Sequence, residues 1–128
     1  IGSRCFLGGA AVFHQFIRIG DLAMVQGSSG FSRDIPPFCT GYRINRVEGL
    51  NVVGLRRAGF DSAARLDLKK AWAAAYKSVH GPVKGAAEAL AAGNWTEAAR
   101  GMLQFIASPG PKGVAGPERP RRTAPQEV

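Results

Sequence analysis

The hydrophobic residues at the start of the chain recur with a period of six. Each hexapeptide begins with an apolar side chain, and its fifth residue is small or aliphatic. Glycine occupies the second position in several of the repeats. The apolar first positions are Ile1, Leu7, Phe13, Ile19, Val25 and Phe31. Because a short fixed period is the sequence signature of a solenoid, we predict that residues 1–37 form a parallel β-helix.

In such a helix each hexapeptide forms one side of a triangular coil, so six repeats make about two coils. The first position of each repeat is expected to point inward and to stack on its equivalents in neighbouring coils. Glycine at the second position, as in Gly8 and Gly20, is expected to supply turn torsions that a Cβ would resist. Since Ile1 falls inside a repeat, we expect further coils before it, and without them an aggregation-prone edge.

The pattern changes after Ile35, where Pro36 and Pro37 are expected to end the solenoid. Residues 38–60 are predicted to form an irregular or extended connecting segment. Helical spacing begins after Asp61, a suitable N-cap residue. The first predicted helix has a single apolar stripe on one face, made of Leu68, Trp72, Tyr76 and Val79.

Two further helices are predicted after the Gly81-Pro82 break. One runs from about residue 83 to 92. The other begins after Asn94 and has three apolar residues on one face, Trp95, Met102 and Ile106. The spacing therefore predicts three helices that bury their apolar faces against one another.

These elements divide the chain into parts. The coils at 1–37 and the connecting segment at 38–60 should be followed by a small all-α domain at 61–108. Residues 109–128 are rich in Pro, Gly and Arg and contain little apolar surface to bury. We therefore predict that 109–128 form a disordered tail.

Composition narrows the classes of function. The formal net charge is +8, but the cations are spread along the chain and do not alternate with aromatic residues, as they do in binders of single-stranded nucleic acid. Cys5 and Cys39 lack the spacing of a metal site and favour a reduced, cytoplasmic compartment. No apolar run reaches the length of about 18 residues that spans a membrane. We expect no metal or cofactor, no nucleic acid and no membrane span.

Three segments, AVFHQFIRIG, SSGFSRDIPPF and GLNVVGLRRAGF, resemble the acyl-carrier-protein-dependent UDP-N-acetylglucosamine O-acyltransferases of lipid A biosynthesis. The resemblance extends from Ile1 to roughly Gly113. It implies that the coils are left-handed, so the expected fold class is a left-handed parallel β-helix followed by a small all-α domain. It also implies a homotrimer whose active sites lie in the clefts between neighbouring β-helices.

The same resemblance implies a reaction. An R-3-hydroxyacyl group would pass from acyl carrier protein to the 3-hydroxyl of UDP-N-acetylglucosamine, the first step of lipid A biosynthesis. A histidine would act as general base, with neither a metal nor a covalent intermediate. In the family that histidine lies on a coil before the position of Ile1, so we expect no catalytic residue within this chain.

Five positions match residues that the family uses to bind its substrates. His14 matches a histidine that helps to hold the substrate, and Gln15 matches a contact to the sugar nucleotide. Asn51 matches a residue that reaches the nucleotide. Arg57 matches an arginine near phosphate, a role suited to its planar, permanently charged donor fork. Gly27 matches the position that sets acyl length, where glycine implies a longer hydroxyacyl chain.

Two alternative functions remain open. The related hexapeptide N-acyltransferase of the same pathway acylates an amine, and an additional N-terminal domain would identify it. A non-catalytic trimeric scaffold could instead bind acyl carrier protein through the basic helical end of the chain. Salt would weaken that binding, because exposed charges are screened by dissolved ions.

Overall fold

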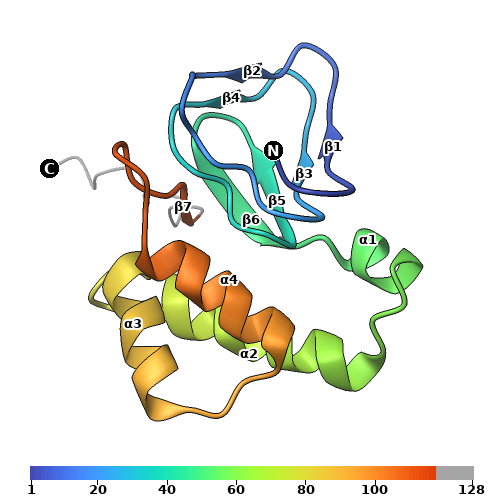
Figure 1. Cartoon of the computed structure of the whole chain (residues 1–128). Coiled ribbons are helices and arrows are strands. Elements are labelled where there is room, and N and C mark those ends of the chain that lie inside the picture. The colour runs from blue at the N-terminus through green and yellow to red at the C-terminus, as the bar shows by residue number, and fades with distance from the viewer. Residues whose placement is uncertain (118–128) are drawn as a thin grey trace, which may run out of the picture.

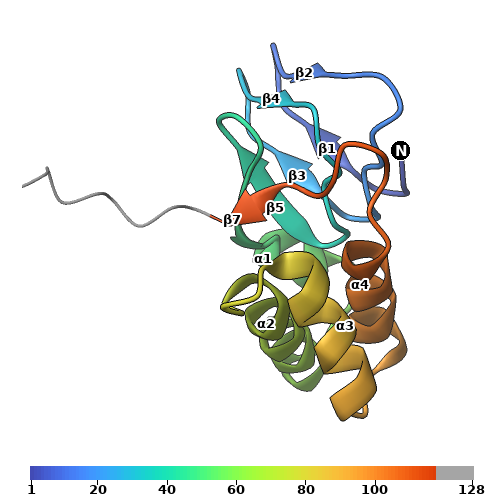
Figure 2. The same cartoon turned by 90° about the vertical axis from the view of Figure 1, so that its left-hand side faces the viewer.

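The computed structural model describes residues 1–117, in which a stack of β-coils lies over a layer of helices (Figure 1). The β-strands are β1 (Phe6–Leu7), β2 (Val12–Phe13), β3 (Met24–Val25), β4 (Gly30–Phe31), β5 (Cys39–Tyr42), β6 (Arg46–Leu50) and β7 (Gly116–Pro117). The helices are α1 (Val52–Arg57), α2 (Ser62–Tyr76), α3 (Pro82–Ala92) and α4 (Glu97–Ala107). Viewed from the side, the coils and the helices form two separate layers (Figure 2).

Strands three hexapeptides apart pair in parallel, as the repeat predicts. β1 pairs with β3, and β2 pairs with β4. At the first positions, Leu7 pairs with Val25 and Phe13 with Phe31, whose rings stack with centroids 6.3 Å apart. Val25 and Phe31 are fully buried, whereas Leu7 and Phe13 are only partly covered, because the first coil is packed against a neighbour on one side. The inward stacking of first positions is therefore confirmed.

The corners of the coils differ from the sequence expectation. The residues with positive φ are not the second-position glycines but the fourth residues of successive repeats, with φ between 55° and 68°: Arg4, Ala10, Phe16, Leu22 and Ser28. Glycine is needed at the second position for a different reason. A Cβ on Gly8 would collide with the backbone of Gly27, and one on Gly20 with the backbone of Pro37. The glycines allow adjacent coils to approach one another, and the expectation that they supply turn torsions is wrong.

Parallel pairing continues beyond Pro37. β5 pairs in parallel with β3, with Met24 opposite Thr40, and β6 then returns antiparallel to β5. The two prolines have no N–H to donate, but the hydrogen bonds between the coils use other donors here. Gly20 N–H donates to Ile35 O, and Ile35 N–H donates to Arg18 O. A β-hairpin, rather than an irregular segment, thus closes the stack and faces the helices.

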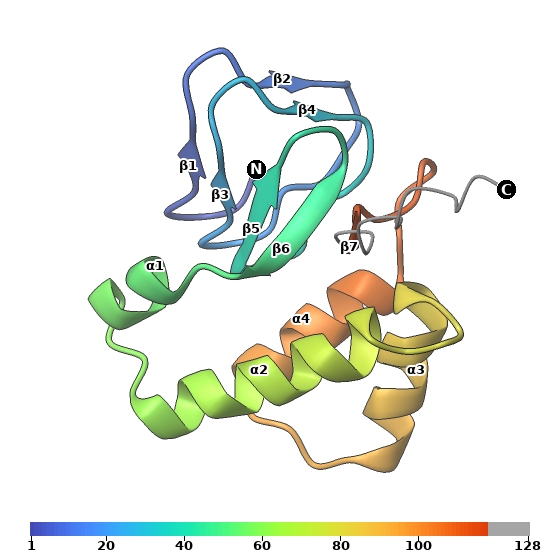
Figure 3. The ribbon, with the colours of Figure 1, turned by 180° about the vertical axis from the view of Figure 1, so that it is seen from behind.

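The three longer helices agree closely with the predicted spacing. Asp61 caps α2, its Oδ1 accepting from Ala64 N–H at 2.8 Å. Two residues were wrongly assigned to the apolar faces of helices. Val79 lies beyond the end of α2 and is 94% exposed. Trp95 precedes Thr96, the N-cap residue of α4. The six-residue helix α1 was not predicted. It lies between the end of β6 and the start of α2, to one side of the hairpin (Figure 3).

A buried polar cluster joins the hairpin to the helices. Cys39 on β5 is fully buried, and burial raises the pKa of its thiol well above the ordinary range, which keeps it protonated. The Trp72 ring stacks on the Tyr76 ring, with centroids 5.1 Å apart. Burial likewise raises the pKa of Tyr76. Cys39 is therefore a packing residue rather than a nucleophile.

Residues 108–117 form an ordered strap, which corrects the prediction that the chain is disordered from residue 109. Val114 and Ala115 are buried, and Tyr76 Oη donates to Ala115 O at 2.9 Å. The strap ends in β7, which pairs in parallel with β6. The predicted disorder of residues 118–128 lies outside the described residues.

Residues 1–117 contain neither a candidate membrane span nor a candidate metal cluster. No helix there is long and apolar enough to cross a membrane. Nowhere in the same residues do three or more His, Cys, Asp or Glu side chains come together in a group that could hold a metal ion.

Candidate functional site

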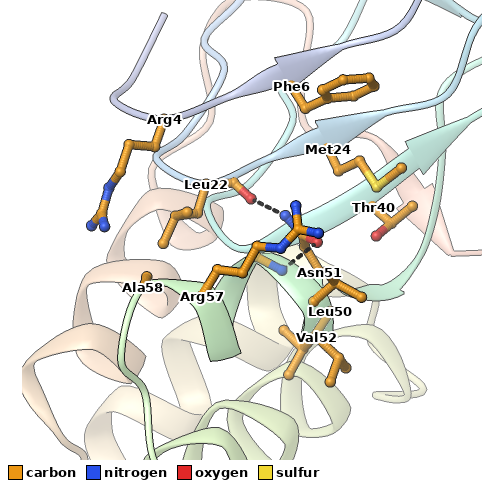
Figure 4. Close-up of a pocket in the computed structure, with 12 residues that line it drawn as sticks. Arg4, Phe6, Leu22, Met24, Thr40, Leu50, Asn51, Val52, Arg57 and Ala58 are labelled. Carbon is orange, nitrogen blue, oxygen red and sulfur yellow. Dashed lines mark hydrogen bonds between the residues drawn. The ribbon is translucent and has the colours of Figure 1, made fainter.

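A pocket of about 660 Å³ lies between the exposed face of β1, β3 and β5 and the helix α1 (Figure 4). Its apolar wall comes from strand residues such as Phe6 and Met24, from Leu50 at the end of β6 and from Val52 at the start of α1. Two arginines and no acidic residue line it. A mostly apolar concavity with a few convergent polar groups is the usual form of a small-molecule site.

Asn51 is fixed at the pocket by two hydrogen bonds. Its Oδ1 accepts from Gly54 N–H at 3.1 Å, which caps α1, and its Nδ2 donates to Leu22 O at 2.9 Å, which ties α1 to the coil. The remaining Nδ2 hydrogen and Oδ1 lone pair are available to a ligand. The structure therefore gives Asn51 a structural role that sequence reasoning missed, alongside its place in the pocket.

Arg57 reaches the pocket from the last turn of α1, and Figure 4 shows its side chain extending toward Asn51. The side chain is exposed, and the neighbouring Arg56 is not part of the pocket lining. Arg4, at a coil corner, is the second cation of the lining and was not identified from the sequence. With two guanidinium groups and no carboxylate in its lining, the pocket favours an anionic ligand such as a phosphate.

His14 and Gln15 lie outside this pocket. They follow β2, which belongs to the separate two-stranded sheet of β2 and β4, and both are exposed. The backbone of His14 is held in the coil ladder by its N–H bond to Phe31 O at 2.8 Å. Within one chain, the predicted substrate residues therefore form two groups, one with Asn51 and Arg57 and the other with His14 and Gln15.

Gly27 also lies outside the pocket, at the corner that follows β3. A Cβ on Gly27 would lie 2.9 Å from the carbonyl oxygen of Gly9 in the preceding coil. A side chain here would consequently press on the backbone of the preceding coil. Glycine at this position has a packing reason in addition to the role in acyl length that the resemblance implies.

The parallel hexapeptide coils, closed by a hairpin and followed by helices, place the chain among the hexapeptide-repeat β-helix proteins. The family model described as UDP N-acetylglucosamine O-acyltransferase, domain 2, matches residues 34–115, and the chain belongs to this family. The match covers the hairpin, all four helices and most of the strap.

Curated relatives have the corresponding name. An acyl-[acyl-carrier-protein]–UDP-N-acetylglucosamine O-acyltransferase from Anaeromyxobacter sp. (strain Fw109-5) is 46% identical over 101 residues, covering 77% of this chain and 36% of the relative. One from Gloeothece citriformis (strain PCC 7424) is 43% identical over 79 residues, covering 61% of this chain and 29% of the relative. The chain thus spans about a third of the length of these relatives.

Solved structures agree in fold. A UDP-N-acetylglucosamine acyltransferase from Campylobacter jejuni is 28% identical with a TM-score of 0.81, over 92% of this chain and 45% of that one. The Arabidopsis UDP-N-acetylglucosamine acyltransferase is 29% identical with a TM-score of 0.73, over 80% of this chain and 38% of that one. The similarity therefore includes both the coils and the helices.

Proposed function

We propose that this chain is the C-terminal part of an acyltransferase that moves an R-3-hydroxyacyl group from acyl carrier protein to the 3-hydroxyl of UDP-N-acetylglucosamine. This is the first step of lipid A biosynthesis. The observation that supports it best is the basic, mostly apolar pocket at α1, which contains both Asn51 and Arg57. The family match over residues 34–115 supports the same assignment.

In this proposal Arg57 binds a phosphate of the sugar nucleotide and Asn51 contacts the nucleotide. His14 and Gln15 hold the sugar from a neighbouring subunit of a homotrimer. The arrangement explains why the two groups lie on different sheets of one chain, since each cleft would take one group from each of two copies. In the same proposal the β-helix is left-handed and makes about two coils. Residues 61–108 form an all-α domain.

The chemistry needs two proton transfers and no cofactor: the proton passes from the sugar hydroxyl to a base and from the base to the leaving thiolate. The oxygen of the sugar 3-hydroxyl attacks the thioester carbonyl, a C–O bond forms and the C–S bond breaks. A general-base histidine takes the hydroxyl proton, and the carrier thiol leaves protonated. We assign this base to a coil that precedes Ile1, so the residues of this chain bind and orient substrate.

The helices are proposed to help dock acyl carrier protein, an acidic partner for their exposed cations, among them Lys69, Lys70 and Lys84. The enzyme would work in the cytoplasm, where its carrier-protein donor is made. Gly27 would leave room for a longer hydroxyacyl chain in the cleft, because it adds no side chain there.

The test is an acylation assay with the full-length protein that contains this chain. We expect mass spectrometry to find an ester on the sugar 3-hydroxyl of UDP-N-acetylglucosamine when R-3-hydroxyacyl carrier protein is the donor. Acylation of a glucosamine amine instead would identify the N-acyltransferase. Carrier-protein binding without turnover would identify a scaffold. Either result would overturn the proposal.

A further inference from the structure

The C-terminal strap brings a lysine to His14. Lys112 Nζ lies 3.3 Å from His14 Nδ1, although the two residues are far apart in the sequence. We propose that Lys112 is a positioning residue that holds the His14 imidazole in one tautomer and orientation for the substrate. The inference rests on the proposed function of His14 and adds a residue that the sequence analysis placed in a disordered tail.

The backbone on both sides of Lys112 is firmly anchored. Gly110 N–H donates to the Asp34 carboxylate at 2.7 Å, and Asp34 N–H donates to Gly113 O at 2.9 Å. Ala115 N–H then donates to Asp34 O at 2.8 Å. Because Asp34 is only 2% exposed and belongs to the coil, these bonds fix the strap directly to the β-helix.

Lys112 itself sits in a tight turn. Gly113 N–H bonds to Gly110 O at 3.0 Å, which places Pro111 and Lys112 at the two central positions. Proline at the first central position presets the torsion that such turns need. The side chain of Lys112 therefore starts from a backbone position that varies little, and the His14 backbone is equally fixed by its coil hydrogen bond.

The chemistry of the pair defines the tautomer. An ammonium group has three N–H donors and no acceptor, so its partner nitrogen must be the unprotonated one. Nδ1 of His14 is then the acceptor, and in the neutral ring the hydrogen is on Nε2. Lys112 thus leaves Nε2–H as the donor that His14 can offer to an oxygen of the sugar. A hydrogen bond to one ring nitrogen of a histidine commonly sets which nitrogen carries the hydrogen, and therefore how the ring functions.

The experiment compares Lys112→Met with Lys112→Arg in the full-length protein. ¹⁵N chemical shifts of histidine-labelled protein report which ring nitrogen carries the hydrogen, and His14→Gln identifies the His14 signals. We expect wild type to show protonated Nε2, Lys112→Met to show a mixture of tautomers, and Lys112→Arg to behave like wild type. KM for UDP-N-acetylglucosamine should rise about fivefold in Lys112→Met with kcat nearly unchanged.

Lys77→Met, at an exposed lysine just beyond the end of α2, is the matched control and should change neither the shifts nor KM. Unchanged His14 shifts in Lys112→Met, or failure of Lys112→Arg to restore them, would overturn the inference. The proposed function fails separately: if His14→Gln binds the sugar nucleotide like wild type, His14 does not hold substrate. The ¹⁵N shifts would still decide whether Lys112 sets its tautomer.

Discussion

Replacing Arg57 with alanine is expected to lower kcat/KM for UDP-N-acetylglucosamine by about 10- to 100-fold. The reason is that a charge-assisted hydrogen bond to phosphate is lost and the phosphate is left without its partner. Steady-state kinetics of the full-length protein measure this directly. Arg57→Lys should retain part of the activity, because lysine keeps the charge but lacks the bidentate fork.

The matched control for this prediction is the adjacent residue. Arg56 has the same charge and lies in the same last turn of α1, but it does not line the pocket. Arg56→Ala should therefore change kcat/KM by less than about twofold, since it removes only a distant, solvent-screened charge. Equal losses in the two variants would mean that general basicity, rather than the pocket, binds the nucleotide.

Replacing Asp34 with alanine is expected to have the largest effect on stability. The buried carboxylate accepts four hydrogen bonds, from Arg18 N, Nε and Nη2 and from Gly110 N, at 2.7–3.0 Å. Arg18 also lies over the Phe105 ring at 4.0 Å, so the cluster joins the coil, α4 and the strap. We expect the free energy of unfolding to fall by about 3 kcal/mol, the lower end for a broken buried pair because the Arg18 side chain is 39% exposed.

Urea unfolding at fixed protein concentration measures this loss, and amide hydrogen exchange shows where it occurs. The Gly110 amide should exchange faster in Asp34→Ala, because its N–H loses the carboxylate that accepts its hydrogen bond. Asp21→Ala is the control. Asp21 is exposed and accepts one bond, from Ser3 N at 2.7 Å, so its loss should cost less than about 1 kcal/mol. Similar losses in both variants would contradict the role given to Asp34.

The coils could be predicted from the sequence because their signal is local and repeated. First-position residues such as Val25 and Phe31 are apolar since each must stack on the residue three hexapeptides away. The helices were predictable for a similar reason, with the periodic residues Leu68 and Tyr76 both buried. Errors occurred at the ends, as with Val79, where an apolar residue continues the spacing after the helix has stopped.

The strap and α1 could not be predicted because their order depends on distant partners. Residues 108–117 look like a tail in isolation, and only Asp34 and Tyr76 explain why they are fixed. α1 is too short to show a periodic pattern. Asn51 and Arg57 could be named from the resemblance, but neither their pocket nor their separation from His14 is visible in one sequence.

We propose that each active site combines Arg57 of one copy with His14 of another. The most direct measurement mixes His14→Ala and Arg57→Ala subunits by co-expression and assays the mixed trimers. If the two residues act across a subunit boundary, random mixing rebuilds an intact pair at about a quarter of the clefts, and activity rises above either variant alone toward that fraction of wild type. Activity that stays at the average of the two single variants would contradict the account, because it would place both residues in a site made by one chain.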